Sequence, residues 1–183
     1  MKKNPELTLC ELVQPSTSVL SSYSPFCEKI HRMLRYAKLS YTRKHGRYPG
    51  EFKAYNPLGK VPVLLVDEHP ISDSTNIARW ILQQRPELFH KNLSQKQKAE
   101  AWLWEEFADN SLSGFLVAAR WADEQNWKKT RATFFGNFPW PLKALLPKIF
   151  RKDVLKQLKN REVWHGDPQD YWNRFSHILQ QLE

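Results

Sequence analysis

The sequence predicts a small α/β unit followed by an all-helical domain. Runs of β-branched and other apolar residues, typical of strands, occur only before about Phe89. Beyond that point apolar residues recur at helical spacing, first in one long pattern over residues 95–125. We therefore expect the element order β-α-β-β-β-α and then helices, with the first unit over residues 1–88 and the helical domain over residues 89–183.

The first half of the α/β unit is predicted to be a strand, a long loop and a helix. The apolar run Leu7–Val13 is typical of a strand, and the Ser- and Pro-rich segment Gln14–Tyr23 is typical of a loop. A helix is expected from Pro25 to about Leu39, because proline suits a first turn, where its missing N–H costs nothing. The apolar residues of this helix fall on one face: Phe26, Ile30, Met33, Leu34 and Ala37.

Three short strands and a second helix are predicted to complete the unit. Ser40–Lys44 is the second predicted strand, and Val61–Val66, rich in β-branched residues, is the clearest strand signal. Ile71 begins a short returning strand after a turn. Either Asp73 or Ser74 is expected to cap the helix that follows.

Three helices are predicted in the second half of the chain. The first is the long pattern over residues 95–125. Glycine and prolines between residues 136 and 141 predict a break, after which a second helix carries Leu145 to Leu158 with Pro147 in its first turn. Asp167-Pro168 marks the start of the third, since it places a capping residue directly before a proline at the first helical position.

Composition is that of a globular protein with an aromatic-rich core. The 183 residues are 41% hydrophobic and 13% aromatic, and two cysteines, Cys10 and Cys27, are too few for a disulfide framework. The N-terminus leads into no hydrophobic signal region, and no run of about 18 apolar residues occurs. We therefore expect a cytoplasmic protein. The six histidines show no metal-ligand spacing, so no metal is expected.

Positive charge is concentrated in one stretch of the chain. Between Lys128 and Arg161 there are ten Lys or Arg residues against a single Asp, so this stretch alone carries the net charge of +9. A solvated face is the default interpretation, and an interface or a contact with lipid or nucleic acid are the alternatives. Because the helix within the stretch has an apolar and a basic side, we hypothesise that it binds an anionic surface, without specific nucleic-acid recognition.

The segment Ser24-Pro25-Phe26-Cys27 stands where a helix begins. Unpaired backbone N–H groups and the positive end of the helix dipole stabilise an anion there, a thiolate in particular. Ser24 is read either as a simple N-cap or as a hydrogen-bond donor to such an anion. Cys27 is read either as a small packing residue or as a redox-active thiol, whereas Cys10 belongs to the core.

Two further segments allow a functional reading. Pro62 interrupts the strand-like run Lys60-Val61-Pro62-Val63, and a cis peptide there, the minority outcome for X–Pro bonds, would free the Val61 backbone for an extended ligand. At a later helix start, Asp73 and Ser74 either cap the helix or share it with a ligand, Asp73 holding an amine and Ser74 a carboxylate.

Taken together, these segments resemble the glutathione transferase superfamily. Its N-terminal domain carries a catalytic Ser, Tyr or Cys before the first helix, an N-P-x-G-K-V-P-x-L segment and an acidic-Ser pair opening a later helix. The corresponding segments are Ser24-Pro25-Phe26-Cys27, Asn56–Leu64 and Asp73-Ser74, in the same order and at matching spacing over the whole N-terminal half. The resemblance implies a thioredoxin-like domain followed by a helical C-terminal domain, a cis bond before Pro62 and glutathione as co-substrate.

The resemblance also implies roles for individual residues. Glutathione would lie beside Val61-Pro62, with Asp73 and Ser74 at its γ-glutamyl end and Lys60 at its glycine carboxylate. Ser24 would be the catalytic residue, donating a hydrogen bond that favours the glutathione thiolate. That thiolate would then attack a small electrophile.

Other segments are similar to the failed-axon/metaxin-like branch of the superfamily. They are Leu34–Ala37, Arg120–Trp127, Phe134–Gly136 leading into Pro141–Lys143, and the long loop Gln14–Tyr23. This similarity keeps a non-catalytic adaptor as an alternative function, and Cys27 keeps a glutathione-dependent thiol reductase as another. Since family members continue beyond a helix like that at residues 171–182, we expect an incomplete helical domain and a homodimer.

Overall fold

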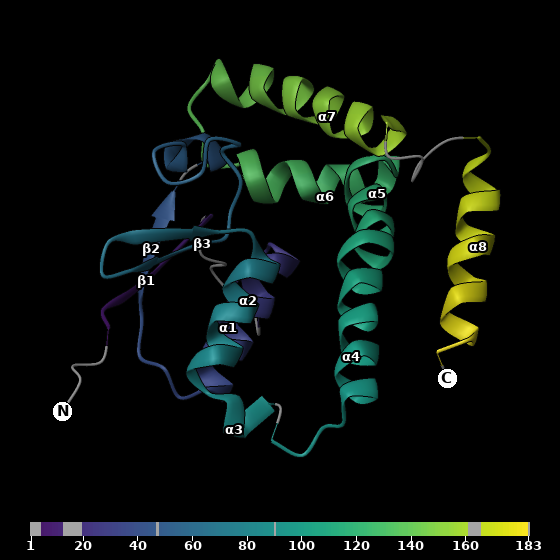
Figure 1. The fold of residues 1–183 in the computed structure, drawn as a ribbon. Helices are drawn as coiled ribbons and strands as arrows, with labels where there is room; N and C mark the ends of the chain where they lie inside the picture. Colours follow the sequence, from purple (N-terminus) through teal and green to yellow (C-terminus); the bar gives the residue numbers. More distant parts are fainter. Residues whose placement is uncertain (1–4, 13–19, 47, 90, 161–165, 183) are drawn as a thin grey trace. The chain divides into compact units, whose positions relative to one another are not determined.

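A computed structural model describes residues 5–12, 20–46, 48–89, 91–160 and 166–182. The chain divides into two compact units, Met1–Lys98 and Ala99–Glu183. All strands of the described residues lie in the first unit, and helices make up the second, which confirms the predicted fold class (Figure 1). The division into functional domains at residue 88 stays a prediction. Residues 13–19 of the expected first strand and loop, and Arg161, lie outside the described residues.

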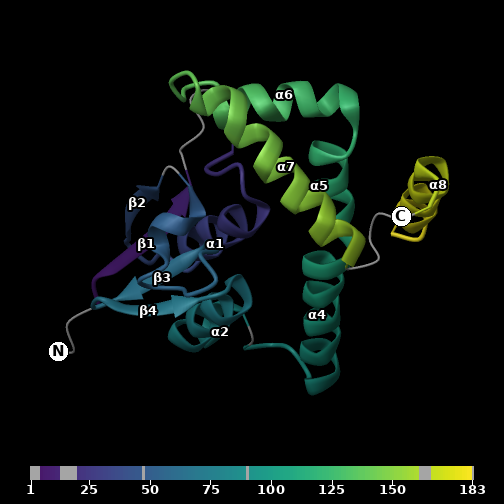
Figure 2. The same cartoon turned by 90° about the horizontal axis from the view of Figure 1, so that it is seen from above.

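Four strands form one mixed sheet in the order β2-β1-β3-β4 (Figure 2). The strand β1 (Leu7–Leu12) pairs in parallel with β2 (Thr42–Gly46) and antiparallel with β3 (Val63–Val66). The strand β4 (His69–Ser72) pairs antiparallel with β3. The prediction that β3 begins at Val61 was wrong, since the strand begins at Val63. Pro62 has no N–H to donate to a ladder, so strand pairing begins only after it.

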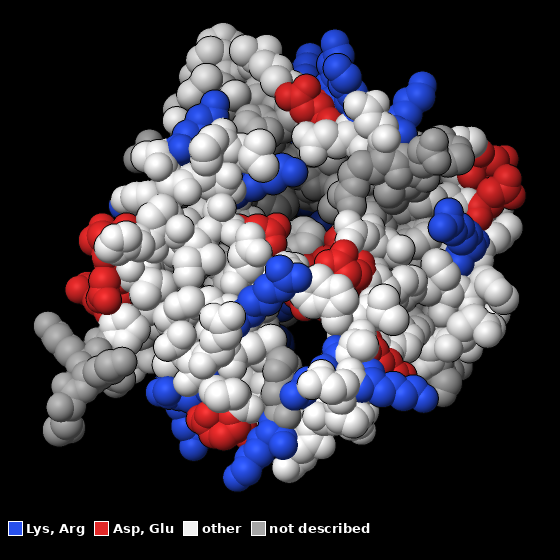
Figure 3. All heavy atoms as spheres, in the orientation of Figure 1, with Lys and Arg blue, Asp and Glu red and all other residues white. Residues whose placement is uncertain are grey.

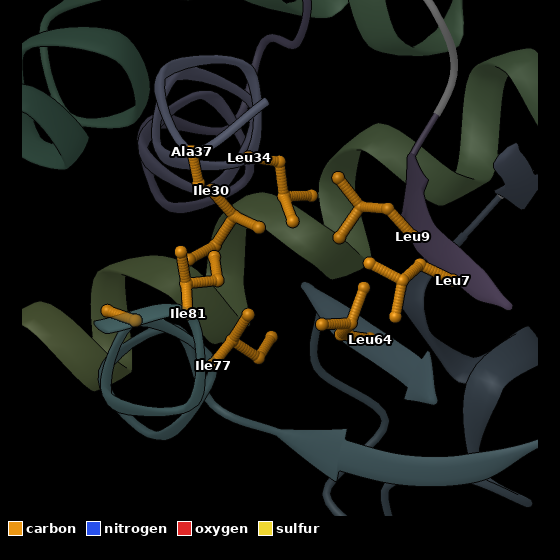
Figure 4. Packing of buried hydrophobic residues seen from close by; sticks show 9 residues of the cluster. Leu7, Leu9, Ile30, Leu34, Ala37, Leu64, Ile77 and Ile81 are labelled. Carbon is orange, nitrogen blue, oxygen red and sulfur yellow. The ribbon is translucent and has the colours of Figure 1, made fainter. Parts of the chain in front are cut away.

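Two helices, α1 (Pro25–Tyr36) and α2 (Ser74–Gln84), contribute to the core on one face of the sheet. Side chains alternate along β1, so that Leu7 and Leu9 point to these helices (Figure 4). A short helix α3 (Pro86–Phe89), which the sequence did not predict, follows α2. The buried residues of this core are Leu7, Leu9, Ile30, Leu34, Ala37, Leu64, Ile77, Ala78 and Ile81.

The other face of the sheet is covered by the loop between β2 and β3. Phe52 of the short helix η1 (Pro49–Phe52) is buried in one cluster with Cys10, Val63 and Leu65. The residues that lead into β3 belong to the same loop. The packing of Phe52 on the sheet therefore helps to fix their position.

The expected single helix over residues 95–125 is interrupted twice. A π-helical turn, η2, replaces regular α-helix in the middle, and Asp123 starts a new helix by accepting a hydrogen bond from Asn126 N–H at 2.7 Å. Pro147 lies inside its helix rather than in the first turn, whereas the last helix starts at Asp167-Pro168 as predicted. The elements are α4 (Gln95–Phe107), η2 (Ala108–Leu112), α5 (Ser113–Trp121), α6 (Glu124–Phe135), α7 (Leu142–Asn160) and α8 (Pro168–Gln180).

Aromatic packing and one arginine hold the second unit together. Phe115 of α5 packs on Tyr171 and Phe175 of α8, with ring centroids 4.4 and 4.8 Å apart. The Arg151 guanidinium of α7 donates to the Trp121 carbonyl at 2.8 Å and so satisfies an unpaired carbonyl where α5 ends. Within the described ranges, no helix has the length and apolarity needed to cross a membrane.

Candidate functional site

Strand register brings the predicted site segments to one end of the sheet. Val63, the first residue of β3, pairs with Cys10 near the end of β1 and with Ser72 at the end of β4. Residues just before β3 and just after β4 therefore share the sheet end at which β1 finishes. These are Lys60, Val61 and Pro62 on one side and Asp73 and Ser74 on the other.

The start of α1 reaches the same end of the sheet. Cys27, in the first turn of α1, hydrogen-bonds the backbone of Leu12, the last residue of β1. Ser24 is the N-cap of this helix, and its hydroxyl oxygen accepts a hydrogen bond from Cys27 N–H at 3.3 Å. A hydroxyl has a second lone pair and a proton to donate. Ser24 is thus the N-cap in the structure, and its O–H, which also hydrogen-bonds the Cys27 thiol, can donate to an anion by turning away from that thiol.

Both cysteines are buried thiols. Cys27 has no exposed surface, and burial raises its pKa to about 12 although hydrogen bonds from Ser24 and Ser22 act in the opposite direction. Burial likewise raises the pKa of Cys10 to about 11. A thiol with such a pKa stays protonated at neutral pH and is a poor nucleophile. The geometry therefore favours the packing interpretation of Cys27.

A side-chain clamp shapes the turn that precedes β3. The buried Asn56 donates from Nδ2 to the Lys60 carbonyl at 2.9 Å and accepts at Oδ1 from Leu58 N–H at 3.1 Å. Gly59 has φ of +63°, a conformation that favours glycine, and donates to the Asn56 carbonyl at 2.7 Å. The Val61–Pro62 peptide bond that follows is cis.

Asp73 caps α2 in a strained backbone conformation. Its φ of 78° and ψ of 132° are rare for a residue with a side chain and cost about 1–3 kcal/mol. Its Oδ1 accepts from Thr75 N–H at 2.9 Å and from Asn76 N–H at 3.4 Å. Ser74 follows as the first helical residue and is buried. Of the two capping candidates, Asp73 is the cap, and strain of this kind clusters at ligand sites.

A buried charged cluster, which the sequence analysis missed, lies at the end of β1. Glu11 is on the side of the strand that Leu7 and Leu9 share, so it faces the helices although it is fully buried. Its carboxylate accepts from His31 Nε2 at 2.9 and 3.0 Å and from Arg43 Nε at 2.5 Å. His45 Nε2 is 3.4 Å from it. The signal in the sequence was an acidic residue inside the apolar run Leu7–Val13.

Protonation states follow from this geometry. Burial raises the pKa of Glu11, but hydrogen bonds and charge from His31 and Arg43 outweigh burial and hold it below its usual value. Because an ionised carboxylate only accepts hydrogen bonds, His31 Nε2 must carry a proton. Burial lowers the pKa of His45, against the pull of Glu11.

The charged cluster also anchors the residues before Ser24. Arg43 Nη2 donates to the Ser21 carbonyl at 2.6 Å. The Glu28 carboxylate of α1 accepts from Ser21 N–H at 2.7 Å and from Ser22 N–H at 3.1 Å. The described part of the loop before α1 is thus tied to both β2 and α1. In the described residues, no group of three or more His, Cys, Asp or Glu side chains could hold a metal.

Comparisons with known proteins show the family of the chain and agree with its fold. Residues 25–126, more than half of the chain, match the glutathione S-transferase N-terminal domain family. Solved structures with the same fold include a rice GST in complex with glutathione (18% identity, TM-score 0.52, 76% of this chain and 66% of that one). Another is a glutathione S-transferase from Methylobacillus flagellatus with GSH bound (17% identity, TM-score 0.50, 86% of this chain and 69% of that one).

A Tau-class glutathione S-transferase from mango is similar at 17% identity and a TM-score of 0.50, over 72% of this chain and 58% of that one. The chain thus spans less than two thirds of the length of the mango and rice proteins. No curated protein compared with the chain is significantly similar to it in sequence.

Proposed function

The chain belongs to the glutathione S-transferase N-terminal domain family, and from this premise we propose that it binds glutathione and conjugates it to small electrophiles. One observation carries the proposal. The register that pairs Val63 with both Cys10 and Ser72, together with the hydrogen bond between Cys27 and the Leu12 backbone, gathers three segments of suitable chemistry at one end of the sheet. Those segments supply the Ser24 hydroxyl, the extended backbone before β3 and the N-terminus of α2.

The peptide part of glutathione would bind along the segment before β3. Its cysteine backbone would pair with the Val61 backbone as an extra antiparallel strand segment. The Asn56 clamp supports this role, because it fixes the carbonyl of Lys60 immediately before Val61. The exposed Lys60 ammonium would bind the glycine carboxylate.

The γ-glutamyl end of glutathione would bind at the start of α2. The backbone N–H and the hydroxyl of Ser74 would hold its carboxylate, which the helix dipole also favours, since the N–H groups of Thr75 and Asn76 already donate to Asp73. Asp73 would hold its ammonium. The hydrogen bonds that cap α2 use Oδ1 of Asp73, and a carboxylate has further lone pairs with which to accept from an amine.

Ser24 would activate the sulfur. The glutathione thiol gives its proton to solvent, and the Ser24 hydroxyl donates a hydrogen bond to the thiolate that remains. With an aryl halide, the sulfur forms a C–S bond to the ring carbon as the C–halide bond breaks, and the halide leaves with the bonding electrons. The protein contributes position and stabilisation of the thiolate, and no protein group is modified.

Titration calorimetry with glutathione and a conjugation assay with an aryl halide test the proposal. Ser24→Ala should keep glutathione binding and lower kcat about a hundredfold, because the thiolate loses a hydrogen-bond donor and less of the bound glutathione is ionised. Ser176→Ala, on exposed α8, is the matched control and should change neither quantity. Wild-type protein that does not bind glutathione would refute the proposal and favour the adaptor.

The remaining alternative, a glutathione-dependent thiol reductase, predicts a different effect of the same variants. A thiol reductase requires activity that Cys27→Ala abolishes while Ser24→Ala retains it. Full burial of the Cys27 thiol speaks against this alternative. The proposal also includes a homodimer, which equilibrium sedimentation tests directly.

A further inference from the structure

A cavity in the second unit is lined in part by cations of the basic stretch between Lys128 and Arg161. A cavity of about 310 Å³ lies between α6 and the start of α7. This volume is at the lower end of small-molecule sites, which range over about 300–1,000 Å³. In Figure 3, Lys and Arg side chains project along the upper edge of the drawn face. The cavity lining is Trp127, Lys128, Arg131, Ala132, Phe135, Gly136 and Lys143.

The lining combines an aromatic floor with small residues that leave space. Trp127, Arg131 and Phe135 follow one another at a spacing of four along α6, so they share one face of the helix. Phe135 is buried and Trp127 partly buried, which makes them the floor. Gly136 cannot carry a side chain, because a Cβ there would lie 2.3 Å from the Ala132 carbonyl oxygen.

The rim of the cavity is cationic. Lys128, Arg131 and Lys143 are exposed, and none of the described lining residues is acidic. Among the described ion pairs, none of 4.0 Å or shorter joins one of these three cations to a carboxylate. Their charge is therefore available to an anion.

A neighbouring arginine, Arg151, engages the acidic residue Glu124 and holds the floor in place. Arg151 binds the Glu124 carboxylate at 2.6 Å, so this acid is engaged outside the cavity. The same guanidinium lies over the Trp127 ring, 5.0 Å from its centroid. The floor is thus preorganised, and Glu124, the acidic residue of α6, is already paired.

We propose that this cavity binds a small organic anion, with an aromatic or apolar body on the floor and a phosphate, sulfonate or carboxylate group on the rim. Arg and Lys recognise such groups through charge-assisted hydrogen bonds, and aromatic side chains favour a planar body. The proposal uses none of the residues assigned to glutathione, so either one can fail without the other.

Titration calorimetry with three probes tests both halves of this recognition. The probes are naphthyl phosphate, uncharged naphthol and inorganic phosphate. Naphthyl phosphate should bind at least about tenfold more tightly than either fragment, because it alone uses rim and floor together. Equal affinity for naphthol, or for inorganic phosphate, would overturn the proposal.

Variants locate the binding to the cavity. Arg131→Gln should weaken naphthyl phosphate about tenfold, whereas Lys152→Gln, an equal charge change on exposed α7 outside the cavity, should not. Ala132→Leu, at an exposed helical position, fills the cavity without changing charge and should abolish binding. Equal weakening by both Gln variants would show general charge attraction, and binding retained in Ala132→Leu would place the ligand elsewhere. Either result overturns the proposal, as does binding to anionic vesicles but not to naphthyl phosphate.

Discussion

Glu11 accepts hydrogen bonds from Nε2 of His31 at 2.9 and 3.0 Å, and both side chains are fully buried. Such a pair needs its partners, because a buried charge without compensation is costly. His31 Nδ1 lies 2.6 Å from the Tyr41 hydroxyl, and Arg43 occupies another side of the carboxylate. Glu11 thus makes polar contacts on the same side of β1 as the core residues Leu7 and Leu9. It does so at the end of the sheet where the candidate site lies.

Removing the Glu11 charge should destabilise the protein strongly. Glu11→Gln leaves His31 and Arg43 without their shared acceptor charge, and we expect a loss of about 3–5 kcal/mol in the free energy of unfolding. Urea denaturation measures it, with exposed Glu87→Gln as the control. A loss no larger than that of the control would mean that the buried cluster contributes nothing to stability.

The same residue should make stability depend on acidity. The folded pKa of Glu11 is lowered, so its contribution is fully present above the unfolded value of about 4.3 and is lost as pH falls through the lower folded value. Wild-type protein should therefore lose stability below about pH 4, and Glu11→Gln should lose less over that range. Parallel stability curves for the two proteins would contradict this assignment.

Arg43 should hold the loop before Ser24. Its guanidinium donates to both Glu11 and the Ser21 carbonyl, and lysine, a single ammonium, cannot reproduce that fork. In Arg43→Lys the amides of Ser21 and Ser22 should exchange hydrogen about tenfold faster, in line with the loss of one hydrogen bond. Arg35→Lys, exposed on α1, serves as the control. Unchanged exchange would show that Glu28 alone anchors the loop.

Asp73 separates helix capping from ligand binding. Asn keeps an Oδ1 acceptor for Thr75 N–H but loses the charge that would hold an ammonium group. Asp73→Asn should therefore weaken glutathione about tenfold or more with little change in thermal stability. Calorimetry and a melting curve measure the two effects, and Asp153→Asn on α7 is the control. A fall in stability without a fall in affinity would assign Asp73 to capping alone.

Cys27 should resist alkylation in the folded protein. Its thiol is fully buried and burial raises its pKa to about 12, so little thiolate exists at neutral pH. Iodoacetamide should modify it only after unfolding in urea, as mass spectrometry of the digested protein would show. Rapid modification of the native protein would restore the reductase alternative.

The sequence predicted features that depend on neighbouring residues alone, such as helix starts. Pro25 and Asp167-Pro168 marked helix starts correctly, because capping depends on adjacent residues. The Glu11 cluster could not be predicted, since it joins residues from β1, α1 and β2 that only folding brings together. The start of α6 was missed for another reason. No glycine or proline separates α5 from α6, so the sequence carries no breaker there, and the cap is recognised from the hydrogen bond that Asn126 N–H donates to Asp123.

The π-helical turn η2 has a consequence for aligning this chain with its relatives. A π turn places one more residue in the turn than an α-helix does, and each residue advances a helix by about 100°. Leu103 and Trp104 before the turn are largely exposed, whereas Phe115 and Ala118 after it are buried. In a gap-free alignment with a relative that lacks the π turn, the buried and exposed positions would correspond either before or after the turn, but not on both sides. A single-residue gap within residues 108–112 would bring both sides back into correspondence.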